Sequence, residues 1–186
     1  EFQSELNDSK FTYGIDYSKV DTSRLRTTKT IGGSTDVAKD TPDTDITRTG
    51  VYLQNEFSKG KFDFISGLRY DSYELDAKPD DYVSSSAAFD LDADKLSPKF
   101  AVTYNINEDL STYAQYSQGF RAPAYYEVNA NFSNPMRGYT TKSNPDLKPE
   151  TSDSYEVGLR GRYSQIDFDV SGFYNKYDNF IEQLVN

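Results

Sequence analysis

Apolar residues recur at every second position in eight segments of this chain, which is the period of a β-strand. The expected strands cover about residues 1–6, 11–20, 48–57, 62–72, 96–106, 110–119, 152–163 and 166–177. Most of them have roughly the 9–11 residues with which a tilted strand crosses a bilayer. The pattern therefore predicts an all-β protein.

Short and long connections alternate strictly between these strands. Short turns are expected at Asn7–Lys10, Ser58–Lys61, Asn107–Asp109 and Ser164–Gln165, and long loops at 21–47, 73–95 and 120–151. If neighbouring strands run in opposite directions, all the turns lie at one end of the sheet and all the loops at the other. Outer-membrane barrels have this asymmetry. We therefore predict an antiparallel up-and-down transmembrane β-barrel.

The number of residues in each turn supports the pairing of the strands. Around residues 107–109 the apolar positions stay even, as a three-residue turn requires, and around Ser164–Gln165 they change from odd to even, as a two-residue turn requires. The first two hairpins obey the same rule. A slip of one residue would turn every apolar side chain to the wrong face. The predicted register places Leu159 opposite Val170 and Val102 opposite Ala114, and in the last hairpin it pairs Arg160 with Asp169 and Arg162 with Asp167.

The two faces of the predicted strands differ in chemistry. Tyr and Phe stand at both strand ends of the apolar face, as in the aromatic girdles of membrane barrels. We expect that face to meet lipid through Phe100, Val102, Tyr104, Leu159, Phe168 and Val170. The opposite face should line the lumen through Glu156, Arg160, Arg162, Asp167 and Asp169. The alternative is a soluble, Tyr-rich β-sandwich, in which the apolar face would form a closed core.

Composition narrows the class further. Hydrophobic residues make up 35% of the chain and no apolar run approaches a membrane helix, whereas the 15% of aromatic residues argue against disorder. The formal net charge of −10 argues against a nucleic-acid partner. Cysteine and histidine are both absent, so no thiolate or histidine metal site and no His-dependent triad can form. We therefore predict that the chain is not an enzyme, and we assign no metal site.

The longest expected loop is bounded by two short sequence boxes. Phe120-Arg121-Ala122-Pro123 opens it, and Asn144-Pro145-Asp146-Leu147 closes it. Prolines restrict the backbone at both ends, and long insertions between ordered strands are usually functional or disordered. The paired boxes, followed by Tyr155-Glu156-Val157-Gly158, resemble the TonB-dependent outer-membrane receptors, and within that family the haem and haemoprotein receptors. The resemblance is strongest over residues 110–182.

This resemblance implies a bacterial outer-membrane protein, in contact with lipid, that binds and imports an iron-bearing ligand. It implies haem taken from a host haemoprotein as the transported ligand, with no permanently bound cofactor. Such receptors have a barrel of roughly 22 strands, a plug domain and a segment that contacts TonB. We therefore expect residues 1–186 to be a barrel segment of about eight strands, with the plug and the TonB contact absent from this chain. The alternatives are a ferric-siderophore receptor, or a self-contained small barrel with a structural or adhesive role.

The loop between the boxes supplies the candidate binding residues. Arg121 could pair with a carboxylate, either Glu150 or a haem propionate. Haem receptors of this kind usually carry a histidine between the two boxes, but this loop has none. Tyrosine phenolates and a methionine thioether are other known haem ligands, although the same side chains often serve only for packing. The candidates for ligand binding are Arg121, Tyr125, Tyr126, Met136, Arg137 and Tyr139.

Overall fold

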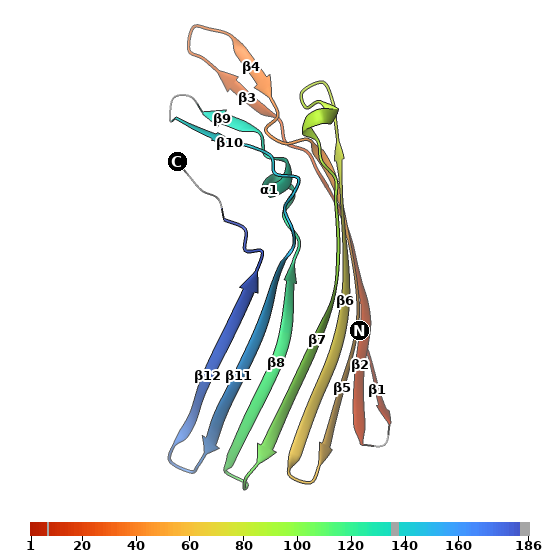
Figure 1. Cartoon of the computed structure of the whole chain (residues 1–186), viewed down its shortest axis with the longest axis vertical. Helices are drawn as coiled ribbons and strands as arrows, with labels where there is room; N and C mark the ends of the chain where they lie inside the picture. The colour runs from red at the N-terminus through yellow and green to blue at the C-terminus, as the bar shows by residue number, and fades with distance from the viewer. Residues whose placement is uncertain (7, 135–137, 183–186) are drawn as a thin grey trace.

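One curved antiparallel sheet forms the body of the protein. The structure, a computed structural model, describes residues 1–6, 8–134 and 138–182. Eight strands follow one another in sequence order: β1 (Phe2–Leu6), β2 (Ser9–Thr22), β5 (Asp43–Lys59), β6 (Phe62–Lys78), β7 (Leu91–Asn105), β8 (Leu110–Arg121), β11 (Glu150–Arg162) and β12 (Asp167–Asp178). The short turns lie at the lower end and the long loops at the upper end (Figure 1). The predicted up-and-down arrangement is confirmed.

Smaller elements occupy the long loops. Strands β3 (Arg26–Lys29) and β4 (Thr35–Ala38) form one hairpin, and β9 (Phe132–Asn134) and β10 (Tyr139–Thr141) form another. A short 3-10 helix, η1 (Ser85–Ala87), and the helix α1 (Tyr125–Asn129) complete the upper end of the molecule (Figure 1). No helix in the described residues has the length and apolar character needed to cross a membrane.

The predicted register is confirmed in every hairpin of the sheet. Leu159 faces Val170 and Val102 faces Ala114, as the turn lengths require. In the last hairpin the Arg160 guanidinium lies 2.8 Å from the Asp169 carboxylate. Gly60 has a φ of +62° in the turn between β5 and β6, a conformation that glycine adopts without strain. Turn length and alternation together therefore determine the pairing.

The strands are longer than predicted, which corrects the loop boundaries. Pairing of β5 with β6 continues to Asp43↔Lys78, and pairing of β6 with β7 continues to Leu75↔Leu91. Much of the segments 21–47 and 73–95, predicted as loops, is therefore strand. In the extension of β6 the apolar residues Tyr73, Leu75 and Ala77 alternate with polar ones, but they face the inner side of the sheet. The apolar pattern therefore changes face above the lipid-facing part of the strand.

The apolar face of the sheet is exposed, as a surface for lipid should be. Val170 is 65% exposed, Val157 61% and Leu159 38%. Val157 and Leu159 lie between Tyr155 of β11 and Tyr163 just after that strand, so aromatic rings flank the aliphatic band at both ends. The exposed apolar side chains do not gather into a closed core, which makes the soluble sandwich wrong.

The opposite face of the lower strands carries a polar network. Tyr113 and Gln115 both donate hydrogen bonds to the Glu156 carboxylate, each at 2.7 Å. The Arg160 guanidinium lies 5.3 Å from the centre of the Tyr113 ring and pairs with Asp169. This face is the expected lumen lining, where water and polar partners satisfy such groups.

A small buried core lies at the upper end, on the same side as the polar network. Leu75 is 0% exposed, Tyr73 4% and Ile46 5%. Leu91 and Ala93 of β7, Ala77, and two residues of the loop after β8 pack against them: Ala122 and Tyr125. The sequence did not predict this core, because its central residues fall in segments expected to be loops. It is the surface against which the loop after β8 folds.

Strands β1 and β12 lie at opposite edges of the sheet. Within the described residues each of them pairs with a single neighbour, β2 and β11 respectively. A self-contained eight-stranded barrel would require the two edge strands to pair with each other, because only closure satisfies their free backbone groups in lipid. The structure shows an open sheet, as expected for part of a larger barrel.

The assignment of the two faces predicts opposite effects for adjacent residues of β12. In the full-length receptor, Val170→Arg should destabilise the folded barrel by about 2–4 kcal/mol, because it puts a charge in the middle of the lipid-facing surface. Ser171→Arg, one residue further on the other face, should be tolerated beside Asp169 and Glu156. Urea unfolding from lipid vesicles measures both effects. Equal losses of stability would contradict the assignment.

Candidate functional site

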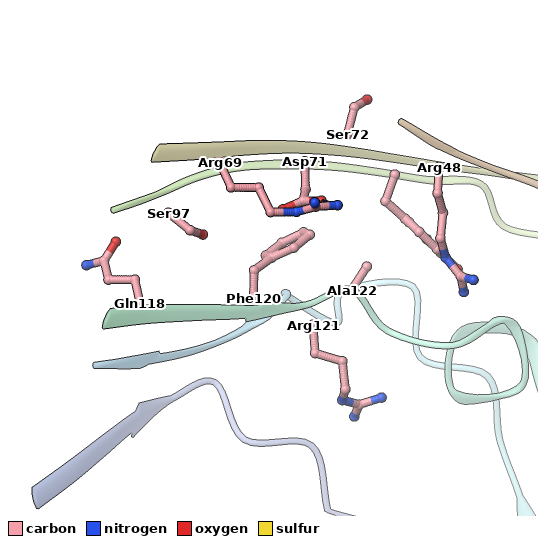
Figure 2. A pocket seen from close by; sticks show the side chains of 10 residues that line it. Arg48, Arg69, Asp71, Ser72, Ser97, Gln118, Phe120, Arg121 and Ala122 are labelled. Carbon is pink, nitrogen blue, oxygen red and sulfur yellow. Dashed lines mark hydrogen bonds and ion pairs between the residues drawn. The ribbon is translucent and has the colours of Figure 1, made fainter. Parts of the chain in front are cut away.

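The sheet divides at its upper end, between β7 and β8. Their pairing stops at Lys99↔Ser117, although β7 stays paired with β6, and β8 with β11, to the ends of those ladders. Phe120 lies beyond this fork and points from β8 toward Arg69 and Asp71 of β6 (Figure 2). The aromatic residue of the first sequence box therefore bridges the two branches of the sheet.

Arg121 points away from that side and joins both ends of the loop (Figure 2). Its two terminal nitrogens donate to the two oxygens of Glu127 at 3.0 and 3.1 Å, and its Nε donates to Glu150. Glu127 also accepts a 2.7 Å hydrogen bond from the Ala124 backbone N–H, and Glu150 accepts one from the Ile181 N–H at 2.7 Å. Of the two partners considered for Arg121, Glu150 is the one that the structure shows.

Arg121, Glu127 and Glu150 together form what we call the Arg121 clamp, and their opposite charges stabilise one another. The hydrogen bond from Arg121 lowers the pKa of Glu150 below its ordinary value, against the opposing effect of burial. The two carboxylates raise the pKa of the Arg121 guanidinium, so that it stays charged at all accessible pH values. The clamp therefore loses its ion pairs only when a carboxylate is protonated.

Helix α1 is anchored on the inner side of the sheet. Val128 is 0% exposed, and Tyr125 packs against the buried core. Asn129, also 0% exposed, makes a reciprocal pair of hydrogen bonds with the backbone of Phe89, both at 2.8 Å. These contacts fix the first turn of the loop to the neighbouring loop between β6 and β7.

The hairpin β3–β4 belongs to the same assembly of loops. The Asn131 N–H donates to the Asp40 carbonyl at 2.8 Å, and Arg26 pairs with the Asp40 carboxylate at 3.0 Å. Arg26 also lies 4.7 Å from the centre of the Phe132 ring in β9. Across the described residues, no group of three or more acidic, cysteine or histidine side chains is arranged to hold a metal ion. The Asn131 hydrogen bond and the contact of Arg26 with Phe132 link the hairpin β3–β4 to the loop after β8.

The remaining predicted site residues lie in different environments. Tyr126 is 55% exposed and meets the edge of Tyr125 at 5.4 Å between ring centres. Tyr139 is 37% exposed and lies 5.8 Å from Phe132. Met136 and Arg137 fall outside the described residues. The structure thus presents two of the three candidate tyrosines at the surface and packs the third, Tyr125, against the core.

The second sequence box forms an exposed turn before β11. Asn144 accepts a 3.2 Å hydrogen bond from the Asp146 backbone N–H through its side chain, a common stabiliser of turns. The Asn144 N–H donates to the Val128 carbonyl at 2.9 Å, so the two ends of the loop touch. Pro145 is exposed and Leu147 is partly buried. The two boxes together close the base of the loop.

Sequence reasoning missed Glu127 and Asn129, which hold the loop most directly. Glu127 carried a usable signal: a glutamate three residues after a helix start can accept from the backbone N–H that begins the helix. Asn129 carried none, because its partner Phe89 lies 40 residues away in another loop.

Comparison with known proteins identifies the class. Residues 1–186 match the family described as "TonB dependent receptor-like, beta-barrel". The chain therefore belongs to the TonB-dependent receptors, which are outer-membrane proteins of bacteria and transporters rather than enzymes.

Two relatives show the range of similarity. A hemin receptor of Yersinia pestis is 30% identical over 192 residues, which cover 94% of this chain and 26% of that protein. The hemoglobin-haptoglobin utilization protein B of Neisseria meningitidis is 32% identical over 141 residues, covering 70% of this chain and 17% of that protein. The chain thus spans about a quarter or less of the length of these relatives.

Solved structures share the fold. The hemophore receptor HasR of Serratia marcescens aligns with a TM-score of 0.71 at 23% identity, over 95% of this chain and 31% of that chain. The copper transporter OprC aligns with a TM-score of 0.72 at 16% identity, over 96% and 29%. A hemophore receptor and a copper transporter align with nearly the same TM-score, so the fold alone does not indicate the ligand.

The clamp predicts a pH-dependent loop in the full-length receptor. The ion pair of Glu150 should be complete above the ordinary glutamate pKa of 4.5 and should be lost as the pH falls through the lowered value of the folded state. A spin label at Lys148→Cys should therefore become mobile only below about pH 4.5. Glu150→Gln should make the label mobile at neutral pH and insensitive to acid. Identical pH profiles in the parent and in Glu150→Gln would contradict the clamp.

Arg121→Gln should loosen the same loop. Because the Arg121 side chain is 45% exposed, we expect the free energy of local opening of the loop to fall by only about 1 kcal/mol. Hydrogen exchange in α1 should then be about fivefold faster. Arg24→Gln, which changes another exposed arginine of the upper loops, is the matched control and should leave exchange in α1 unaltered.

Proposed function

We propose that this chain is part of the barrel of a receptor that binds haem at the cell surface and imports it. The observation that carries this proposal is the similarity to a hemin receptor and a hemoglobin-haptoglobin utilization protein over most of the chain. The two sequence boxes, typical of haem and haemoprotein receptors, support it further. The plug domain and the TonB contact would come from parts of the receptor outside residues 1–186.

The loop between the boxes is the proposed haem contact. Tyr126 and Tyr139 present phenol groups at the surface of a loop whose base is held by ion pairs and a buried helix. A tyrosine phenolate is a known axial ligand of ferric haem, and aromatic rings also pack well on its flat apolar face. Met136 and Arg137 join the proposal because they lie between the two boxes in the sequence, close to Tyr139.

The other two candidates have positioning roles in this proposal. Arg121 already gives its terminal and Nε donors to Glu127 and Glu150, so it braces the loop rather than reaching a propionate. Tyr125 packs on the buried core and orients Tyr126 beside it. A rigid base of this kind lowers the entropy that a loop loses when it binds.

A ferric siderophore is the second candidate ligand. The observation in its favour is the absence of histidine from the whole chain, since haem receptors of this kind usually carry a histidine between the boxes. Phenol and arginine side chains could equally contact an oxygen-rich iron chelate.

Substitution of the exposed tyrosines tests the proposal in the full-length receptor. The double variant Tyr126→Phe/Tyr139→Phe should weaken haemin binding about tenfold and remove the phenolate-to-iron absorption band, because it deletes only the two hydroxyls. The single variants then assign the ligand. Tyr163→Phe, an exposed tyrosine at the opposite end of the sheet, is the matched control.

A further variant and a further ligand distinguish the proposed haem site from the alternatives. Alanine at Met136, Arg137 and both tyrosines should abolish growth on haem while the receptor still assembles. If this variant bound and used haemin like the parent, the haem site would lie on the plug or on the other long loops. If the parent bound a ferric siderophore and not haemin, the siderophore alternative would replace haem.

A further inference from the structure

A cavity of about 430 Å³ lies where β7 and β8 part. Phe120 and Gln118 of β8 line one side, and Arg69 and Ser97 line the other (Figure 2). Ala122, in the first sequence box, also lines it, so the cavity adjoins the base of the loop proposed to contact the ligand.

Two hydroxyl groups that line this cavity are buried without a partner. Within the described part of the chain, neither the Tyr73 hydroxyl nor the Ser97 hydroxyl makes a hydrogen bond. Tyr73 as a whole is only 4% exposed. Buried polar groups are almost always hydrogen-bonded, because an unsatisfied group costs free energy. Each hydroxyl therefore keeps a proton that it donates to none of the described residues.

One arginine of the cavity lining has no carboxylate partner among the described residues. Arg69 pairs with Asp71 and Asp16, each at 2.8 Å, so its charge is matched. Arg48 has no carboxylate within 4.0 Å among the described residues, and it lies 5.4 Å from the centre of the Tyr73 ring. One guanidinium without a carboxylate partner, next to the Tyr73 hydroxyl, favours an anion with several oxygens.

We propose that this cavity binds a carboxylate group of the transported ligand, held by Arg48 and Tyr73, which face each other across β5 and β6. The carboxylate is a haem propionate if the receptor transports haem, and that choice of source rests on the proposed function. A siderophore of the citrate type would offer the same group. Phe120 forms an apolar wall, so the cavity accepts a carboxylate on a hydrocarbon arm rather than a free inorganic ion.

The test compares three ligands in titrations of the full-length receptor: haemin, haemin dimethyl ester and ferric citrate. The ester lacks the two carboxylates but keeps the porphyrin and the iron. The parent should bind haemin about tenfold more tightly than the ester, as expected for one good charged contact. Arg48→Gln should remove that preference by weakening haemin binding alone.

Conservative variants separate binding from folding. Tyr73→Phe keeps the ring in the buried core and deletes only its hydroxyl, and it should also narrow the preference for haemin over its ester. Arg48→Lys should restore part of the preference, because it keeps the charge. Arg24→Gln is the control for loss of a positive charge elsewhere in the upper loops.

The outcomes distinguish this inference from the proposed function. If the parent bound ferric citrate and not haemin, and Arg48→Gln weakened citrate binding, the carboxylate site would stand while the assignment to haem failed. If haemin and its ester bound the parent equally well, and Arg48→Gln changed neither, haem transport would stand and the carboxylate site would be overturned. No effect of either variant on any carboxylate ligand would also overturn it.

Discussion

The strict alternation of side chains across the paired strands is the constraint on which this structure depends. One face of every strand meets lipid and the other meets the lumen, so a slip of one residue in any hairpin would place groups such as Arg160 and Asp169 in the membrane. The backbone must also be fully paired there, because lipid offers no hydrogen bonds. The turn lengths give each side chain its correct face and keep the backbone paired. They also place all the long loops at the opposite end of the sheet.

The functional end of the molecule begins where that constraint is relaxed. Beyond Lys99↔Ser117 the strands β7 and β8 no longer pair, and the chain is free to turn inward. The loop uses this freedom to bury α1 against the core at Tyr73 and Leu75, while Arg121 joins Glu127 and Glu150 across its base. The same fork leaves the cavity lined by Tyr73 and Ser97, whose hydroxyls have no hydrogen-bond partner in the described part of the chain. A regular sheet thus positions an irregular site.

Sequence reasoning predicted what depends on short-range periodicity. It gave the register of the hairpins, because a turn of known length links the parity of two strands, as at Leu159 and Val170. It did not predict the core at Leu75, because in the strand extensions the apolar residues change to the inner face and break the phase of the lipid-facing pattern. Nor could it pair Asn129 with Phe89, since two long loops place no limit on how their residues meet. The relative positions of the site residues depend on such contacts between distant loops, so the sequence could not predict them.

The most direct measurement is a structure of the full-length receptor with haemin bound. The account predicts haem against the loop between the two sequence boxes, with the Arg121 clamp intact and a carboxylate in the cavity beside Arg48. A structure in which haem binds away from this loop, with the cavity filled by a side chain from another part of the receptor, would contradict it.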